Sequence, residues 1–304
     1  GGKGIVGLTT RDSDFVKDLI ITSTHDYLMF FTDLGKVYKI KAYEIPEATR
    51  TARGTPAINF LNLLQRERIT AVIPVKEFSE DKYLIAITKN GLIKKTALNE
   101  FDTKRTTGLI AINLKDEDEL IAIKQSTGSN NIIIVTKKGK CISFSERDVR
   151  PMGRIASGVR AIKLDKDDEV VSMELVEPEQ QLMVVTENGF GKRTPVEEYK
   201  IQVRGGKGLL TYDKAKFSKT GALIGAMVVD ESDEILMINS DGIIIRIRAS
   251  EVSILGRATQ GVKIMKVDEG SKIVAIAKAI RDDEEEAEES SPSTSNETEE
   301  QISL

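Results

Sequence analysis

The chain has 304 residues, and its 40% apolar content is enough to bury the core of one large domain or two ordinary domains. No apolar run approaches the roughly 18–20 residues that a membrane-spanning helix needs. A single cysteine, Cys141, excludes an internal disulfide framework and favours a reducing compartment. Because the chain begins without an initiator methionine or a charged-then-apolar leader, we expect a soluble fragment of a longer protein.

The formal net charge of −4 divides into two opposite parts. Ten of the 48 acidic side chains lie between Asp282 and Glu300, and no lysine or arginine follows Arg281. Residues 1–281 therefore carry 44 basic and 38 acidic side chains, a net charge of +6, and we expect the tail at 282–304 to be disordered. A basic body with an acidic tail is typical of a polyanion binder whose tail competes for the binding surface. A tail that only increases solubility has the same composition.

The first recurring element along the chain is a 14-residue segment that occurs five times. Each copy is a β-branched run, a polar turn with a glycine, and a second strand-like run, which together predict a β-hairpin. The first runs are almost wholly apolar, so we expect buried strands, whereas the second runs carry Lys or Arg and are expected to be exposed. The copies begin at Tyr27, Tyr83, Asn131, Gln181 and Glu234, and their turn glycines are Gly35, Gly91, Gly139, Gly189 and Gly242.

A second element follows each hairpin at a nearly constant distance. An acidic residue stands nine residues past the turn glycine, and an arginine stands fifteen residues past it, or fourteen in the case of Arg105. Another glycine then opens an aliphatic strand, and these opening glycines lie 50 to 54 residues apart. They are Gly4, Gly54, Gly108, Gly158, Gly208 and Gly261.

Four strands in each repeat of about 50 residues predict the blades of a propeller-like ring. There are six opening glycines but five hairpins, so we expect a sixth blade built from both ends of the chain, which would remove exposed strand edges. The sequence thus predicts an all-β, six-bladed ring of four-stranded blades over residues 1–281.

The loop "QVRGGKG", Gln202 to Gly208, contains the first four residues of the chain, "GGKG". A nucleotide-binding loop of this kind needs Ser or Thr directly after its lysine, but Gly208 follows Lys207. We therefore interpret the stretch as one copy of the connector between repeats, related to "RTARG", "RTTG", "RIASG" and "RATQG".

These residues resemble a known family, the C-terminal domain of the A subunit of bacterial DNA gyrase. The stretch at 202–208 matches six of the seven positions of that domain's Q-R-R-G-G-K-G box, with Val203 in place of an arginine. "YEIPEATR", "NGLIKKTALNEF" and "NGFGKRTPVEEY" also resemble the domain, and the resemblance extends from Gly1 to about Ile280. The first four residues resemble the end of the box in the first blade, without its three leading residues. The box positions are Gly1, Gly2, Lys3, Gly4, Gln202, Arg204, Gly205, Gly206, Lys207 and Gly208.

The resemblance implies a six-bladed β-pinwheel, a propeller relative whose blades exchange strands and whose rim wraps duplex DNA without sequence specificity. It implies a holoenzyme of two A and two B subunits that uses ATP and Mg to introduce negative supercoils, while this domain holds no cofactor. It also implies a bacterial cytoplasmic, nucleoid-associated location, no membrane contact, and a monomeric isolated domain. The family's DNA-cleaving tyrosine lies N-terminal to this domain, so we expect no catalytic site here.

Cations at regular intervals suit a polymer with regular phosphate spacing, so we expect the repeat arginines and their basic neighbours to contact DNA. The alternative is that each arginine pairs with the acid of its own repeat, for example Arg204 with Glu198, as a structural clasp. The predicted DNA-binding residues are Lys3, Arg50, Arg53, Lys104, Arg105, Arg154, Lys192, Arg193, Arg204, Lys207 and Arg257.

Catalytic and metal-binding sites have little support in the sequence. His25 is the only histidine, and it cannot form a triad with Ser23 and Asp26 because neighbours on a strand point to opposite faces. One His and one Cys cannot build a Cys/His zinc site. Two alternatives stay open: the equivalent domain of topoisomerase IV, and a protein-interaction β-propeller, although the chain has no tryptophan for a repeated Trp-Asp signature.

Overall fold

Each predicted hairpin belongs to a separate β-sheet in the computed structural model, which describes residues 24–46 and 61–279, and a hairpin forms the centre of each of the four four-stranded sheets. The hairpins turn on glycines in the left-handed region, such as Gly189 at φ 83°. A Cβ at Gly189 would lie 2.1 Å from the carbonyl oxygen of Met265, so only glycine fits this turn. The hairpin strands are β1 (Tyr27–Thr32) and β2 (Lys36–Lys41), β4 (Tyr83–Thr88) and β5 (Leu92–Ala97), β8 (Asn131–Thr136) and β9 (Lys140–Ser145), β12 (Gln181–Thr186) and β13 (Phe190–Pro195), and β16 (Glu234–Asn239) and β17 (Ile244–Arg248).

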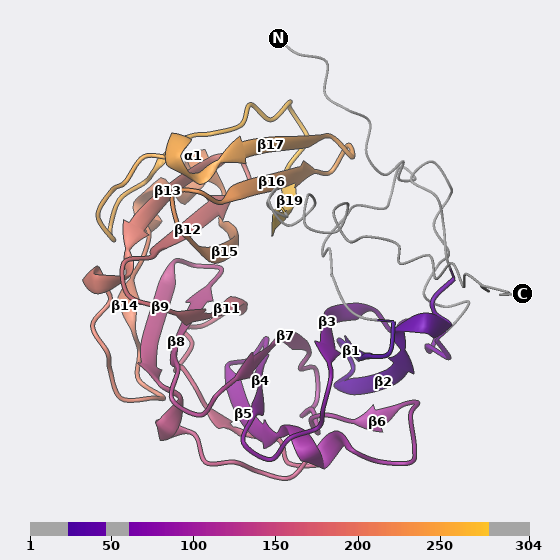
Figure 1. Ribbon diagram of the computed structural model, residues 1–304. Helices are drawn as coiled ribbons and strands as arrows, with labels where there is room; N and C mark the ends of the chain where they lie inside the picture. The colour runs from indigo at the N-terminus through magenta and orange to yellow at the C-terminus, as the bar shows by residue number, and fades with distance from the viewer. Residues whose placement is uncertain (1–23, 47–60, 280–304) are drawn as a thin grey trace, which may run out of the picture.

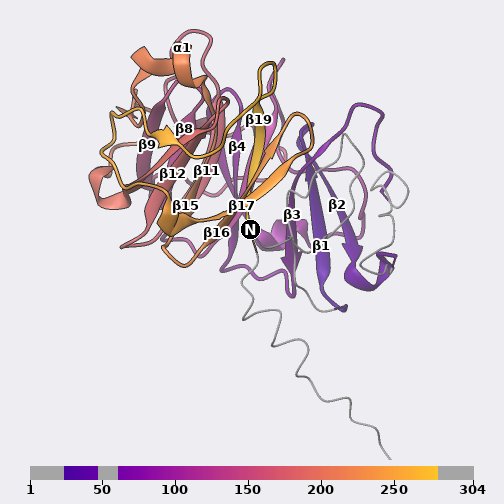
Figure 2. The same ribbon diagram turned by 90° about the horizontal axis from the view of Figure 1, so that it is seen from above.

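An inner strand adds to each hairpin from a later part of the chain. It pairs antiparallel with the first strand of its hairpin and lies at the centre of the ring (Figure 1). In the perpendicular view, the strands run roughly along the ring axis (Figure 2). The inner strands are β3 (Ile69–Val75), β7 (Leu120–Ser126), β11 (Val170–Val176), β15 (Leu223–Val229) and β19 (Ile273–Lys278).

The outer strands are exchanged between neighbouring blades. β6 (Leu109–Ile110) follows the hairpin of β4 and β5 but pairs with β2 of the preceding sheet, with Ile110 opposite Lys36. The same exchange recurs for β10 (Val159–Arg160), β14 (Leu209–Leu210) and β18 (Val262–Lys263). Successive blades are therefore interlocked, because the strand after one hairpin covers the edge of the sheet before it.

A short 3-10 turn follows each hairpin and contains the acidic residue of the repeat. In two of these turns the carboxylate is a cap, since Glu44 accepts from the backbone N–H of Lys41 and Glu251 from that of Arg248. The turns are η1 (Ala42–Glu44), η3 (Leu98–Phe101), η4 (Glu146–Asp148), η5 (Val196–Glu198) and η7 (Ala249–Glu251); η6 (Lys214–Lys216) and α1 (Phe217–Thr220) precede β15.

The hydrophobic core lies between successive sheets. Phe31 of β1 and Phe101 after β5 are fully buried and meet edge-on, with ring centroids 6.1 Å apart. They share a cluster with Leu84 and Leu120, so this cluster joins the first two sheets. The prediction of buried first strands is confirmed, since five of the six residues are buried in each of β1, β4, β8 and β12.

The second hairpin strands differ from the prediction that they are exposed. In β5 and β13, Lys94, Lys95, Lys192 and Arg193 are at most 5% exposed. Lys94 and Lys192 donate to backbone carbonyls of loops that lie 60 or more residues further along the chain. The pattern of apolar and polar residues within a strand could not reveal that these distant loops cover its lysines. β17 agrees better with the prediction, because its residues alternate between exposed and half-buried and none is buried.

The described residues form five sheets, which corrects the expected six blades. The fifth sheet consists of β17, β16 and β19, three strands rather than four within the described ranges. Gly4 and Gly54 and the tail at 282–304 lie outside those ranges, so the expected ring closure and disordered tail fall on residues that are not described. The prediction of an all-β, propeller-like ring is confirmed.

Gly208 is expected to be essential for strand exchange. It precedes β14 with φ at 75°, and a Cβ there would lie 2.2 Å from the carbonyl oxygen of Cys141 in β9. Gly208→Ala should therefore lower the free energy of unfolding by about 3 kcal/mol, measured as a lower thermal midpoint. Gly206→Ala is the matched control, because the nearest atom to its Cβ would be 3.8 Å away. Equal midpoints for the two variants would contradict the prediction.

Candidate nucleic-acid interface

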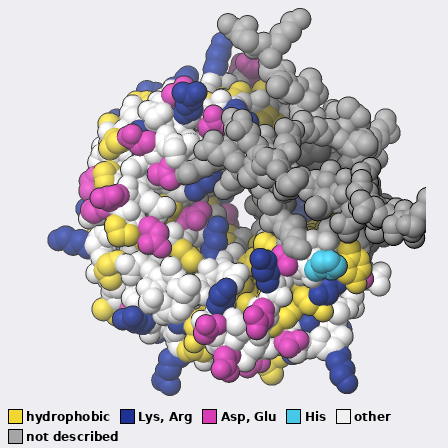
Figure 3. Space-filling view, viewed as in Figure 1, with side chains coloured by type: hydrophobic (Ala, Val, Ile, Leu, Met, Phe, Trp, Pro, Cys, Tyr) yellow, Lys and Arg dark blue, Asp and Glu magenta, His cyan; other side chains and the backbone are white. Residues whose placement is uncertain are grey.

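In the described ranges, the turns η3, η4, η5 and η7 each lead into a loop that runs along the preceding blade towards the outer strand. Three of these loops form an isolated parallel bridge to the second hairpin strand of that blade, and the bridged pairs are Lys95–Pro151, Ser143–Ile201 and Arg193–Ile254. We call the loops at 103–108, 151–158, 201–208 and 254–261 the rim loops, and 201–208 the box loop. Lys and Arg side chains project from the perimeter of the ring (Figure 3).

Arg204 in the box loop is held by backbone carbonyls of the preceding blade. Its Nε donates to the carbonyl of Asp148 at 3.1 Å, and its Nη1 to the carbonyl of Arg160 at 2.6 Å. These acceptors belong to turn η4 and strand β10, so one guanidinium joins two segments. The alternative of a clasp between Arg204 and Glu198 is therefore wrong: the partners of Arg204 are carbonyl oxygens of another repeat, and no ion pair with Glu198 occurs among the described residues.

Arg154 repeats this geometry in a second rim loop, and Arg257 repeats its Nη1 contact in a third. Arg154 donates from Nε to the carbonyl of Glu100 at 2.9 Å and from Nη1 to that of Ile110 at 3.1 Å. Arg257 donates from Nη1 to the carbonyl of Leu210 at 3.1 Å. Both side chains are half-buried, as is Arg204, and within residues 24–46 and 61–279 none of the three forms an ion pair. Their positive charge is thus fixed in place without being neutralised.

The other predicted DNA-binding residues are of three kinds: exposed residues on the rim loops, residues outside the described ranges, and the buried pair Lys192 and Arg193. Lys104, Arg105 and Lys207 are exposed on the rim loops. Arg105 donates from Nε to the carbonyl of Thr107 at 2.9 Å, so its contact is local to its own loop. The residues outside the described ranges are Lys3, Arg50 and Arg53, with the box residues Gly1, Gly2 and Gly4.

Lys192 and Arg193 lie beneath the rim loop 254–261, which corrects their prediction as direct DNA contacts. Lys192 is fully buried, and its ammonium donates to the carbonyl of Gly256 at 2.8 Å. Arg193 is 3% exposed and donates from Nε to the carbonyl of Val252 at 2.8 Å. Burial lowers the pKa of the Lys192 ammonium to about 8. Both side chains support the loop from inside the blade.

The box loop is a connector in the structure, as interpreted from the sequence. Its backbone is tied down by the N–H of Gln202, which donates to the carbonyl of Ser143 at 2.7 Å, and by the N–H of Gly205, which donates to that of Ala161 at 2.8 Å. Gly205 adopts φ 88°, a left-handed conformation that glycine allows. Val203 is 83% exposed, so an apolar side chain projects where the family's box has an arginine.

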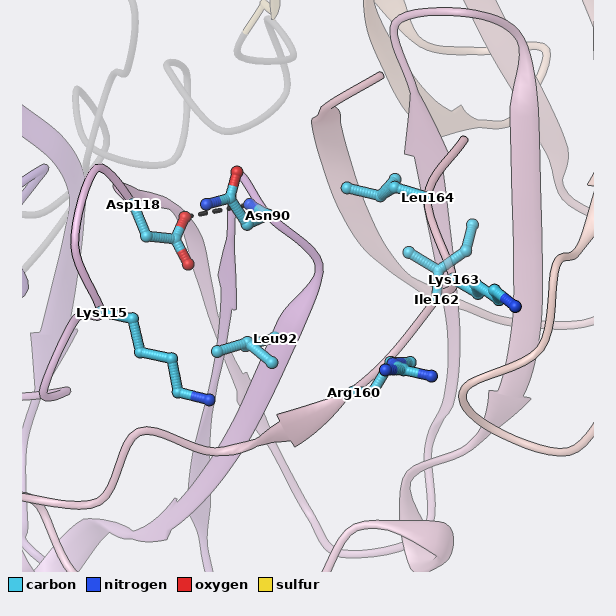
Figure 4. A pocket seen from close by; sticks show the side chains of 8 residues that line it. All are labelled: Asn90, Leu92, Lys115, Asp118, Arg160, Ile162, Lys163 and Leu164. Atoms are coloured by element: carbon cyan, nitrogen blue, oxygen red, sulfur yellow. Dashed lines mark hydrogen bonds between the residues drawn. The ribbon is translucent and has the colours of Figure 1, made fainter. Parts of the chain in front are cut away.

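A basic cavity beside the box loop was not predicted from the sequence. It has a volume of about 440 Å³, and its lining includes Lys115, Arg160 and Lys163 (Figure 4). The backbone N–H of Lys163 donates to the carbonyl of Gly206 at 2.8 Å, which places the cavity directly next to the box loop. The sequence signal for this cavity was the alternation of basic and apolar residues in "GVRAIKL". Neighbours on a strand point to opposite faces, and in the structure Arg160 is exposed while Ala161 is buried.

Other kinds of site find no support in the described part of the chain. His25 is exposed, and no group of three or more His, Cys, Asp or Glu side chains in the described ranges could hold a metal ion. No helix in these ranges is both long and apolar enough to span a membrane. Burial raises the pKa of the Cys141 thiol to about 12, so it stays protonated at neutral pH.

The family described as "DNA gyrase C-terminal domain, beta-propeller" matches residues 26–76, 82–126, 130–177, 180–230 and 233–279. The chain is 49% identical over 290 residues to the A subunit of DNA gyrase from Clostridium acetobutylicum, a match that covers 95% of this chain and 35% of that protein. It is 43% identical over 294 residues to the A subunit of DNA gyrase from Mycolicibacterium smegmatis, covering 95% and 34%. The chain thus spans about a third of the length of these relatives.

Two solved structures share the fold. The C-terminal domain of DNA topoisomerase IV superposes with a TM-score of 0.82 and 25% identity, covering 90% of this chain and 84% of that chain. The DNA gyrase A C-terminal domain superposes with a TM-score of 0.75 and 30% identity, covering 90% of both chains. The five matched segments coincide with the five hairpins and their inner strands. The chain therefore belongs to the DNA gyrase C-terminal domain family.

Proposed function

We propose that the chain binds, bends and wraps duplex DNA around its rim loops without sequence specificity, as the C-terminal domain of a DNA gyrase A subunit. One observation carries the proposal: Arg154, Arg204 and Arg257 occupy equivalent places in three rim loops, fixed by carbonyls and without a described carboxylate partner. A fixed, unneutralised guanidinium is well suited to a phosphate, because little side-chain entropy remains to be lost on contact.

The surroundings of these arginines extend the contact surface. Arg154 and Arg204 use Nε and Nη1 for the carbonyls, so Nη2 makes no hydrogen bond with described residues and is available to phosphate oxygens. Lys104, Arg105 and Lys207 add exposed cations on the same loops. The cavity lined by Arg160 continues this surface beside the box loop. Contacts of this kind are to the DNA backbone, so they position the duplex without reading its sequence.

Bending the duplex requires several contacts at once. Curving roughly 40 bp through about 180° costs on the order of 10 kcal/mol for a persistence length of about 150 bp. About ten phosphate contacts at about 1 kcal/mol each would offset that cost. Binding should therefore depend on most blades together and should weaken strongly as salt is added.

A wrapped duplex has a consequence for the whole gyrase. In a full-length A subunit, assembled with B subunits, the wrap would set the sign of the crossing through which a second segment passes, and ATP with Mg would act on other parts. Such an assembly would work in the bacterial cytoplasm at the nucleoid. The nearly complete box loop and the higher identity to the gyrase A domain, 30% against 25%, favour gyrase over topoisomerase IV.

The salt dependence of binding tests the proposal. With six or more phosphate contacts, a plot of log affinity against log salt concentration should have a slope of about −5 or steeper, because each contact contributes about −0.9. Titration of the 304-residue chain with duplexes of two unrelated sequences should give the same slope and similar affinities. A slope near −1 would contradict wrapping, and a strong preference for one sequence would contradict backbone recognition.

A further inference from the structure

We propose that Lys94 and Lys192 are positioning residues, each of which is buried beneath a rim loop and holds the arginine of that loop in place for DNA. The inference rests on the proposed function and extends it to two side chains that cannot themselves reach a duplex, since they are 1% and 0% exposed.

Lys94 lies in β5 beneath the rim loop 151–158. Its ammonium donates to the carbonyl of Arg154 and to that of Ala156 at 3.3 Å. The third donor is used by the carbonyl of Ala111 at 2.5 Å, in the segment directly after outer strand β6. One ammonium thus satisfies three carbonyls and ties the loop to the neighbouring blade.

Lys192 occupies the same place in β13 beneath the rim loop 254–261. It donates to the carbonyls of Gly256 and Arg257 and to Oγ1 of Thr259, the last at 3.0 Å. Its ammonium lies 5.6 Å from the ring centre of Tyr212, a residue that follows outer strand β14. In both loops, therefore, the lysine binds the backbone carbonyl of the rim arginine itself.

The box loop provides an internal comparison. Lys94, Lys192 and Ile142 hold the same register position in their hairpins. Ile142 lies beneath the box loop, with its Cδ1 3.9 Å from where a Cβ of Gly206 would be. The lysine of that loop is Lys207, on the exposed side. Each of these three loops is thus associated with one arginine and one lysine. In the box loop the lysine is Lys207, an exposed residue of the loop itself, whereas beneath the other two loops the lysine is buried in the hairpin strand.

Several charged groups face the two buried ammonium groups. Burial lowers the pKa of Lys94 to about 7; Arg154 lowers it further and Glu100 acts in the opposite direction. Burial also lowers the pKa of Lys192 to about 8; the charged groups around it are Glu198 and Asp213, which raise it, and Arg257, which lowers it, while the nearby Cys141 thiol is neutral in this range. Both lysines therefore change charge near neutral pH.

Stability and DNA affinity should respond to pH in opposite directions. Because the pKa values are lower in the folded state, the folded protein binds fewer protons than the unfolded chain above about pH 7, and the free energy of unfolding rises with pH there. Deprotonation removes positive charge beneath two rim loops, so DNA affinity should fall over the same range. A loss of DNA binding at higher pH would thus not result from unfolding.

Loop-resolved amide hydrogen exchange and DNA titration test the proposal on the 304-residue chain. Lys94→Met should increase exchange in 151–158, and Lys192→Met should increase it in 254–261, while the box loop stays unchanged in both. The double variant should bind duplex DNA about tenfold more weakly near pH 6.5. The parent should lose about fivefold in affinity between about pH 6.5 and about pH 9, and the double variant should lose this dependence.

The control is Lys137→Met, which removes a surface lysine that pairs with Glu169 at 3.9 Å and should change none of these readouts. If a methionine variant fails to fold, the double variant of Lys94→Gln and Lys192→Gln keeps donors for the loop carbonyls without a charge, and should retain loop order while losing the pH dependence. If the parent binds DNA and the double variant keeps its affinity and pH profile, the positioning role is overturned and the proposed function stands. If the parent does not bind DNA, the proposed function fails, and the loop-specific exchange still tests whether the lysines hold the loops.

Discussion

Replacing Arg154, Arg204 and Arg257 together by alanine is expected to weaken DNA binding at least about 100-fold and to abolish bending. Three phosphate contacts at about 1 kcal/mol each account for that factor, since about 1.4 kcal/mol is tenfold. The exposed cations that remain could not offset an elastic cost on the order of 10 kcal/mol. A titration measures the affinity, and fluorescence transfer between the ends of a duplex of about 40 bp measures the bend.

A charge-preserving variant separates the two roles of these arginines. Each guanidinium also ties its loop to the preceding blade, as Arg204 does through Asp148 and Arg160. Changing all three arginines to lysine keeps the positive charge but loses the planar guanidinium that donates to two carbonyls at Arg154 and Arg204 and to one at Arg257. The lysine variant should therefore keep most of the salt slope while its thermal midpoint falls as in the alanine variant. If the alanine variant still brings the duplex ends together, the DNA path does not follow these loops.

Removing residues 282–304 is expected to tighten DNA binding about tenfold at low salt and to change little at about 0.5 M salt. The segment holds ten acidic side chains and no basic residue. Because it is attached to the basic body, its effective concentration at the binding surface is on the order of 1 mM. At about 0.5 M salt the Debye length falls to about 4 Å, which screens this competition. Titrations of the full and truncated chains at both salt concentrations measure the effect.

A neutral tail is the control for this truncation. Changing the acidic residues of 282–300 to Asn and Gln keeps the length and removes the charge, so it should tighten binding as much as the truncation does. If the neutral tail leaves affinity unchanged while the truncation increases it, bulk rather than charge is responsible. Unchanged affinity for both variants would leave the tail a role in solubility alone.

Much of the architecture was predictable because it depends on local interactions. A tight hairpin turn needs a residue at positive φ, so the glycines in these turns, such as Gly91 and Gly189, reveal each hairpin directly. Alternation between buried and polar runs then predicted the buried first strands, and the repeat of about 50 residues predicted the blades of a ring. The place of the arginine in each repeat followed from the same spacing.

The tertiary structure was needed wherever the partner of a residue lies far along the chain. Lys94 and Lys192 look like exposed strand residues, yet loops 60 or more residues away cover them, so no pattern within the strand shows their burial. The partner of Arg204 is a backbone carbonyl, which every residue has, and so leaves no trace in the sequence that would distinguish it from Glu198. The number of blades also depends on how the sheets meet around the ring, and counting opening glycines predicted six where the described residues form five. Local chemistry specifies which segments form strands and turns, whereas burial, charge pairing and closure arise only when distant segments pack together.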